Sequence, residues 1–215
     1  MAITDEQRLT IYNSALRIIG SRNLTTVSEG REPRRVLDTI WDDDMLNTLL
    51  EMGEWLFASR LVQIQSDPDI TPLFGYSYVM SLPSDYVRIC GVYTDEMMKT
   101  PMLDYKIVGT RILTSFDKVY LHYVSNGDSW GGDFTLWPSS FKKLVEAYIA
   151  LEAAPRLKSQ TDEETLKKRY SSALINAQSK DCMKQPTRFP PLGKWQTARR
   201  VGSSWSNSHR NSGQF

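Results

Sequence analysis

Histidine and cysteine are scarce in this sequence of 215 residues, which contains two of each. Cys90 and Cys182 are too few for a disulfide framework or a four-cysteine metal site, so we expect reduced thiols. His122 lies in a strand-like run, where packing in a sheet is the simpler role, and His209 lies in a polar tail. Because histidine is the commonest general base, this scarcity argues against nucleophilic catalysis and against a metal centre.

Several sequence signatures are also missing. No Gly-x-Ser-x-Gly elbow, Gly-x-x-x-x-Gly-Lys phosphate loop or Gly-x-Gly-x-x-Gly turn occurs, so we expect no cofactor. The first residues lack the basic and apolar regions of a signal peptide, and no apolar run approaches the ~20 residues that span a bilayer. We therefore expect no membrane partner, and a protein made and used in a cytoplasm or exported only within something larger.

Acidic residues are absent from the last thirty positions, 186–215. The segment holds five basic residues and spaces several rings between them: Arg188, Lys194, Arg199, Arg200 and Arg210, with Phe189, Trp195 and Trp205. With so few aliphatic residues it cannot bury a core, so we expect it to be disordered or loosely attached when free. Removing these five from 26 basic residues leaves 21 against 25 acidic ones, a body near −4. The pattern predicts an acidic body, 1–185, with an extended docking arm, 186–215.

Helical periodicity marks both ends of the body. Four helices are predicted, over residues 4–20, 32–58, 138–155 and 161–183. Thr4 and Gln7 fit a capping box at the start of the first helix, and Gly20 suits its end. Thr161 and Glu164 fit a second capping box at the start of the last helix.

The middle of the chain, 62–125, changes to strand-like alternation. Its short runs, bounded by turn residues, are 76–82, 87–93, 105–108, 111–114 and 119–124. Gly109-Thr110 is typical of a hairpin turn, and the lack of crossover helices favours antiparallel pairing. The predicted fold class is therefore α+β, a helical bundle with an inserted small antiparallel β region and an extended C-terminal arm.

The second predicted helix is apolar on more than one side. One stripe runs along Leu37, Trp41, Met45 and Leu49, and other apolar residues face elsewhere. A helix of a small domain normally needs one apolar stripe, so burial between two neighbours in one chain and a subunit interface both remain open. The candidates for such an interface are Val36, Ile40, Trp41, Leu46 and Leu50.

Carboxylates are the catalytic resource that remains. The acids that stand out in and after the second predicted helix are Asp42, Asp43, Asp44, Glu51 and Glu54. Glycoside hydrolysis needs two carboxyl groups about 5 to 9.5 Å apart, one of them in an apolar pocket. A carboxylate-dependent peptidoglycan hydrolase is therefore one alternative function, although charge runs are usually solvated faces.

The arm raises a second alternative, a DNA-binding module. Arginines interleaved with Trp and Phe can neutralise phosphates and stack on bases. Five charges over thirty residues are sparse, however, and an acidic body repels DNA. This charge balance suits a protein that encloses DNA without gripping it.

Several segments, in their order and spacing, resemble the head-to-tail adaptor family of short-tailed bacteriophages, also called tail tubular protein A or gatekeeper proteins. They are Ile11–Gly20, Glu32–Asp38, Glu54–Ala58, Leu82–Arg88 and the late stretch Pro186–Gly193. Together they span most of the chain, while each is only moderately specific.

The resemblance implies a virion protein of the tail or neck, assembled in the host cytoplasm without enzymatic turnover. It implies a ring of twelve copies between the portal protein and the tail nozzle protein, with genomic DNA passing through the lumen without sequence-specific binding. A C-terminal extension docks on the portal in such rings. The residues of the predicted portal-binding arm are Arg188, Phe189, Pro190, Pro191, Leu192, Lys194, Trp195, Arg199 and Arg200.

Overall fold

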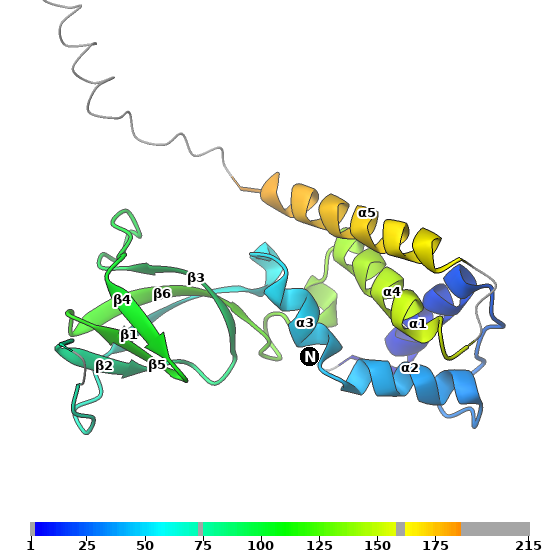
Figure 1. The fold of residues 1–215 in the computed structure, drawn as a ribbon, viewed down its shortest axis with the longest axis horizontal. Coiled ribbons are helices and arrows are strands. Elements are labelled where there is room, and N and C mark those ends of the chain that lie inside the picture. Colours follow the sequence, from blue (N-terminus) through cyan, green and yellow to red (C-terminus); the bar gives the residue numbers. More distant parts are fainter. Residues whose placement is uncertain (1–2, 73–74, 158–161, 186–215) are drawn as a thin grey trace, which may run out of the picture. The chain divides into compact units, whose positions relative to one another are not determined.

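A computed structural model describes residues 3–72, 75–157 and 162–185 of the chain. Residues 1–182 form one compact unit. Its described residues contain five α-helices and six β-strands, and the strands lie between the third and fourth helices in the sequence (Figure 1). The predicted α+β class with an inserted antiparallel β region is confirmed, whereas the predicted arm lies outside the described residues.

The first helix, α1, spans Asp5–Ile19 and has both predicted caps. Thr4 Oγ1 accepts from the Gln7 amide at 3.4 Å, and Gln7 Oε1 accepts from the Thr4 amide at 3.1 Å. Gly20 ends the helix in the left-handed conformation, with φ of 80°. The apolar side of α1, which includes Ile11, Leu16 and Ile19, is buried.

The predicted continuous helix over 32–58 is wrong, because the chain breaks there into three pieces. These are α2 (Glu32–Asp42), α3 (Met45–Glu51) and the short 3₁₀ turn η1 (Leu56–Ala58). Asp44 adopts φ of 52°, a left-handed conformation that cannot continue an α-helix. After α3, Trp55 is buried and donates through Nε1 to the Leu49 carbonyl at 2.9 Å, which fixes the second break.

The remaining helices are α4 (Ser139–Ala153) and α5 (Glu163–Cys182), close to their predicted bounds. The capping box predicted at Thr161 lies outside the described residues. α4 packs on α1, α2 and α5 and supplies the centre of the bundle core. Phe141 lies there in contact with the Trp55 and Trp137 rings, with centroids 5.0 and 5.1 Å away.

The β region consists of two three-stranded antiparallel sheets. The strands are β1 (Ser59–Gln65), β2 (Tyr78–Ser81), β3 (Tyr86–Tyr93), β4 (Tyr105–Val108), β5 (Arg111–Thr114) and β6 (Lys118–Ser125). One sheet has the order β1-β6-β3 and the other β2-β5-β4. None of the predicted runs covers β1, which begins at Ser59, before the predicted β region that starts at residue 62. The predicted hairpin at Gly109-Thr110 is confirmed.

A second core fills the β region. Its fully buried members include Met80, Ile112, Leu121 and Tyr123, which come from both sheets. Two hydrogen bonds join this region to α3: Arg88 donates to the Glu51 carbonyl at 3.0 Å, and the Asn126 side-chain amide donates to Asn47 Oδ1 at 2.9 Å. None of the described helices is long and apolar enough to cross a bilayer.

Candidate functional site

The five interface candidates on the second predicted helix divide into two groups. Val36 and Leu50 are buried in the chain's own core, 6% and 0% exposed, so they are withdrawn as interface residues. Ile40, Trp41 and Leu46 also pack against that core but are only partly buried, and they keep some surface for a neighbour. Each of the two helices contributes both kinds: α2 holds buried Val36 with partly buried Ile40 and Trp41, and α3 holds buried Leu50 with partly buried Leu46.

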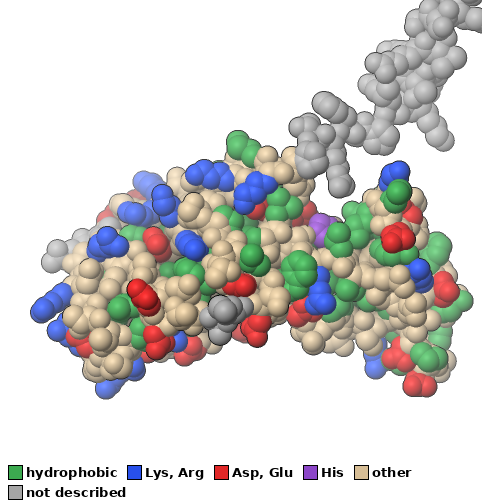
Figure 2. All heavy atoms as spheres, turned by 180° about the vertical axis from the view of Figure 1, so that it is seen from behind, with side chains coloured by type: hydrophobic (Ala, Val, Ile, Leu, Met, Phe, Trp, Pro, Cys, Tyr) green, Lys and Arg blue, Asp and Glu red, His purple; other side chains and the backbone are tan. Residues whose placement is uncertain are grey.

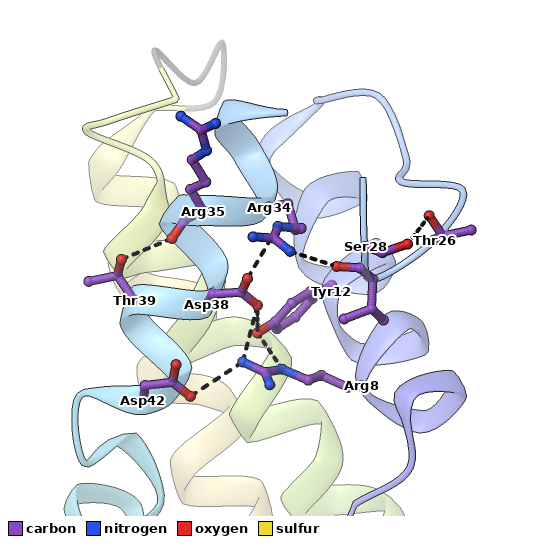
Figure 3. A network of polar contacts seen from close by, with 10 residues as sticks. Arg8, Tyr12, Thr26, Ser28, Arg34, Arg35, Asp38, Thr39 and Asp42 are labelled. Carbon is purple, nitrogen blue, oxygen red and sulfur yellow. Dashed lines mark hydrogen bonds and ion pairs between the residues drawn. The ribbon is translucent and has the colours of Figure 1, made fainter. Parts of the chain in front are cut away.

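Next to Trp41, a network of polar side chains joins α1 to α2 (Figure 3). We call it the α1–α2 cluster and define it as Arg8, Tyr12, Arg34, Asp38 and Asp42. Asp38 is its centre: Arg8 lies 3.1 Å from Oδ1, Tyr12 donates to the same oxygen at 2.9 Å, and Arg34 Nε lies 3.3 Å from Oδ2. Arg8 also reaches Asp42 Oδ1 at 3.4 Å.

Two aromatic rings flank the Arg8 guanidinium. Its Cζ lies 5.3 Å from the centroids of both Tyr12 and Trp41, and the two rings meet edge to face at 5.9 Å. Burial raises the pKa of Tyr12, the Arg8 hydrogen bond opposes this, and Asp38 adds to the rise. Tyr12 is therefore a neutral hydrogen-bond donor, and the cluster fixes Trp41 against the helices of its own chain.

A second polar cluster lies inside the β region around Asp85, which belongs to the Leu82–Arg88 segment of the resemblance. Asp85 accepts hydrogen bonds from Arg60 at 2.7 Å, Tyr123 at 3.0 Å and Ser125 at 2.5 Å. Burial by itself raises the pKa of Asp85, but these three donors outweigh it and lower that pKa below its usual value. Burial and the Asp85 hydrogen bond together raise the pKa of Tyr123 to about 12.

The β region also carries most of the large apolar side chains that are exposed in the described part of the chain. Seven of the ten lie there: Leu61, Tyr78, Met97, Leu103, Ile107, Val108 and Phe116. Figure 2 shows such side chains interspersed with charged ones over the surface. Ile175 in the second half of α5 and Met183 directly after that helix are also exposed. The concentration of exposed apolar side chains in one region of the sequence makes the β region a candidate interaction surface.

The acids considered for hydrolysis lie on the surface rather than in an apolar pocket. Asp42, Asp43, Asp44, Glu51 and Glu54 are all exposed, and Asp42 is engaged by Arg8. His122 lies in β6, where its Nε2 contacts Ser59 Oγ. Burial is the main cause that raises the pKa of Cys90 to about 11, and the nearby Glu54 charge adds to it. Within the described ranges, no group of three His, Cys, Asp or Glu residues is placed to hold a metal ion.

The portal-binding residues predicted between Arg188 and Arg200 lie outside the described residues, but the helix that leads to them is described. The last two turns of α5 are attached to the segment that precedes β1. Asp181 Oδ2 accepts from the Leu56 amide at 2.7 Å, and Gln178 donates to the Met52 carbonyl at 2.8 Å. We call these two contacts the α5 clamp.

No family model matches this chain, and no curated protein matches it.

The sequence analysis predicted neither the α1–α2 cluster nor the α5 clamp, although the first of them left a signal in the sequence. Arg34 and Asp38 are four residues apart on a helix, the spacing of an ion pair, which could have pointed to the α1–α2 cluster. The α5 clamp left no such signal, because Leu56 and Asp181 are 125 positions apart and the contact uses a backbone amide.

Proposed function

We propose that this protein is a structural adaptor of a short-tailed phage virion, which joins the portal protein to the tail nozzle protein as a ring of copies around the DNA channel. The observation that carries the proposal is the concentration of exposed apolar side chains on the inserted β region. A binding protein needs such surface, and this surface lies in a part of the sequence separate from the segment that leads into the arm.

Two further observations support this reading. The segments that resemble the adaptor family contribute tertiary contacts: Tyr12 and Asp38 join α1 to α2, Asp85 organises the β region, and Arg88 reaches α3. Ile40, Trp41 and Leu46 keep partly exposed surface on the bundle, as sideways contacts between ring copies require. The proposed mechanism is binding without turnover.

Deletion of residues 186–215 tests the arm. We expect the truncated chain to fold but to lose co-purification with the portal protein, because the aromatic anchors Phe189 and Trp195 are removed and aromatic residues dominate binding hot spots. Alanine at Trp195 should weaken portal binding about tenfold or more.

The matched control is alanine at Trp130, an aromatic residue of the body whose ring lies 5.8 Å from the Arg60 guanidinium. Unchanged portal binding by the truncated chain refutes the arm's role. A peptidoglycan zymogram of the intact protein, repeated with Asp42→Asn, separates the hydrolase alternative from the adaptor.

A further inference from the structure

Among the described residues, the outer strand β4 of the β4–β5 hairpin has no strand paired to its other side. In the order β2-β5-β4, β4 (Tyr105–Val108) is an outer strand, paired with β5 on one side. Its partner residues run from Tyr105 opposite Thr114 to Val108 opposite Arg111, with Gly109-Thr110 as a two-residue turn. Gly109 has φ of 61°, as the first position of a II′ turn requires.

The register fixes which backbone groups of β4 point away from β5. In an antiparallel pair, hydrogen-bonded and non-hydrogen-bonded residue pairs alternate, and the pair that closes a two-residue turn is hydrogen-bonded. Val108 and Arg111 therefore bond to each other, whereas Ile107 directs its N–H and C=O outward, and so does Tyr105.

The opposite side of the same sheet obeys the same alternation. Leu82 donates to the Thr110 carbonyl at 2.8 Å. By the same alternation, the β2 residues whose backbone groups bond to β5 are the even-numbered ones. Val79, an odd-numbered residue, turns its carbonyl away from β5 and accepts from the Asp67 amide at 2.8 Å. The β2 side is thus already used within the chain, whereas no described strand pairs with the outward groups of β4.

Apolar side chains border this edge. Ile107 and Val108 are 41% and 48% exposed. Leu103, two residues before β4, is 89% exposed, and Phe116, two residues after β5, is 46% exposed. Val108 also lines a hollow of about 320 Å³ on the outer face of the sheet, together with Val79 and Leu113. Natural proteins usually protect an edge with such composition, because it is a template for another strand.

We propose that the β4 edge, Tyr105–Val108, accepts an extended segment of a different polypeptide as a fourth strand, with apolar side chains at alternate positions. The outward donors and acceptors of Tyr105 and Ile107 are two residues apart, about 7 Å along the strand. An extended backbone presents its own donors and acceptors at the same spacing and can therefore pair with them. The identity of the partner rests on the proposed adaptor function, in which the segment belongs to the tail nozzle protein.

The size of the edge favours this occupant over a second copy of the chain. Four residues extend about 13 Å, too short for two identical edges to bury the ~1,000 Å² of a stable interface. A contact this small binds weakly by itself. It suits an assembly that repeats the contact many times, because each contact formed raises the effective concentration for the next one. The arm is a poor strand donor at its start, where Pro186, Pro190 and Pro191 cannot donate to a ladder.

Proline at Ile107 is the sharpest test, since it deletes an outward N–H and leaves the chain's own ladder intact. We expect I107P to bind the purified nozzle protein at least about tenfold more weakly, with portal binding and thermal unfolding unchanged. I107T keeps the backbone amide and only replaces the apolar ethyl arm of the side chain by a hydroxyl, so its loss of nozzle binding should be smaller than that of I107P. I175T makes the matched substitution on α5, at a residue 67% exposed, and should behave as wild type.

Hydrogen exchange supplies a second readout that needs no variant. The Tyr105 and Ile107 amides should exchange rapidly in the free protein and become protected in the complex with the nozzle protein. Wild-type nozzle binding by folded I107P, or rapid exchange of both amides in the complex, overturns the edge assignment alone. If the wild-type protein binds neither portal nor nozzle, the adaptor function fails as well.

Two other occupants would also be recognised and would overturn the proposal. A wild-type dimer that becomes monomeric in I107P identifies a second copy at the edge. Protection of the Ile107 amide in the free protein that disappears when 186–215 are deleted identifies the arm.

Discussion

Asp85 shows how a single carboxylate organises the β region. It receives donors from β1 and from two residues of β6, so it connects the central and one outer strand of the first sheet. Arg60, one of these donors, lies with its guanidinium 5.8 Å from the Trp130 ring. A carboxylate with three donors is satisfied in its ionised form, and replacing it leaves these donors without their acceptor.

Asp85→Asn should therefore lower the free energy of unfolding by about 2 to 4 kcal/mol at neutral pH. The pKa of Asp85 is lowered in the folded protein, so its stabilising effect is present above the unfolded-state pKa near 4 and is lost as pH falls through the folded-state value. Urea unfolding of both proteins between pH 3 and 8 checks this.

The difference in the free energy of unfolding between the wild-type protein and Asp85→Asn should be constant from pH 6 to 8 and should shrink at acid pH. A constant difference down to pH 3 would show that the ionised carboxylate contributes nothing specific.

At the scale of elements, the break between α2 and α3 was predictable in part. Asp42-Asp43-Asp44 was interpreted as a charge run, yet aspartate is also a poor helix former that tolerates the left-handed conformation. The caps of α1 and the β4–β5 hairpin were predicted correctly, because each depends on a few adjacent residues. No predicted run corresponds to β1 (Ser59–Gln65), since the apolar residues Leu56–Ala58 just before it suit a helix and a buried strand equally.

Substitution of Asp44 tests this explanation of the break. Asp44→Gly should leave stability unchanged or raise it by up to about 1 kcal/mol, because glycine adopts φ of 52° without steric cost. Asp44→Ala should destabilise by about 1 kcal/mol for the opposite reason. Thermal unfolding followed by circular dichroism measures both, and equal effects of Gly and Ala would show that backbone conformation is not the determinant.

For the whole molecule, the packing places residues 1–182 in one compact unit, so the body should not depend on residues 186–215 for stability. Deleting them should change the free energy of unfolding by less than about 0.5 kcal/mol. Calorimetry of full-length and truncated protein checks this, and a clear loss in the truncated form would mean that the arm packs on its own body.

The sequence predicted the fold class of the body better than it predicted which of its residues are exposed. Val36 and Leu50 were candidates for an interface because apolar residues in excess of one stripe look the same whether a neighbour is covalently linked or not. Ile107 and Val108 were seen as part of a strand, but their exposure depends on the strand order, which places β4 at the outside.

The α5 clamp has a mechanical consequence. Tension applied to the end of α5 reaches the Asp181 and Gln178 side chains first, and they hold the backbone of Leu56 and Met52 just before β1. Pulling on the C-terminus therefore loads the entrance to the β region before it loads the buried apolar layers of the bundle. A force applied at the end of α5 is thereby delivered to the segment that precedes β1.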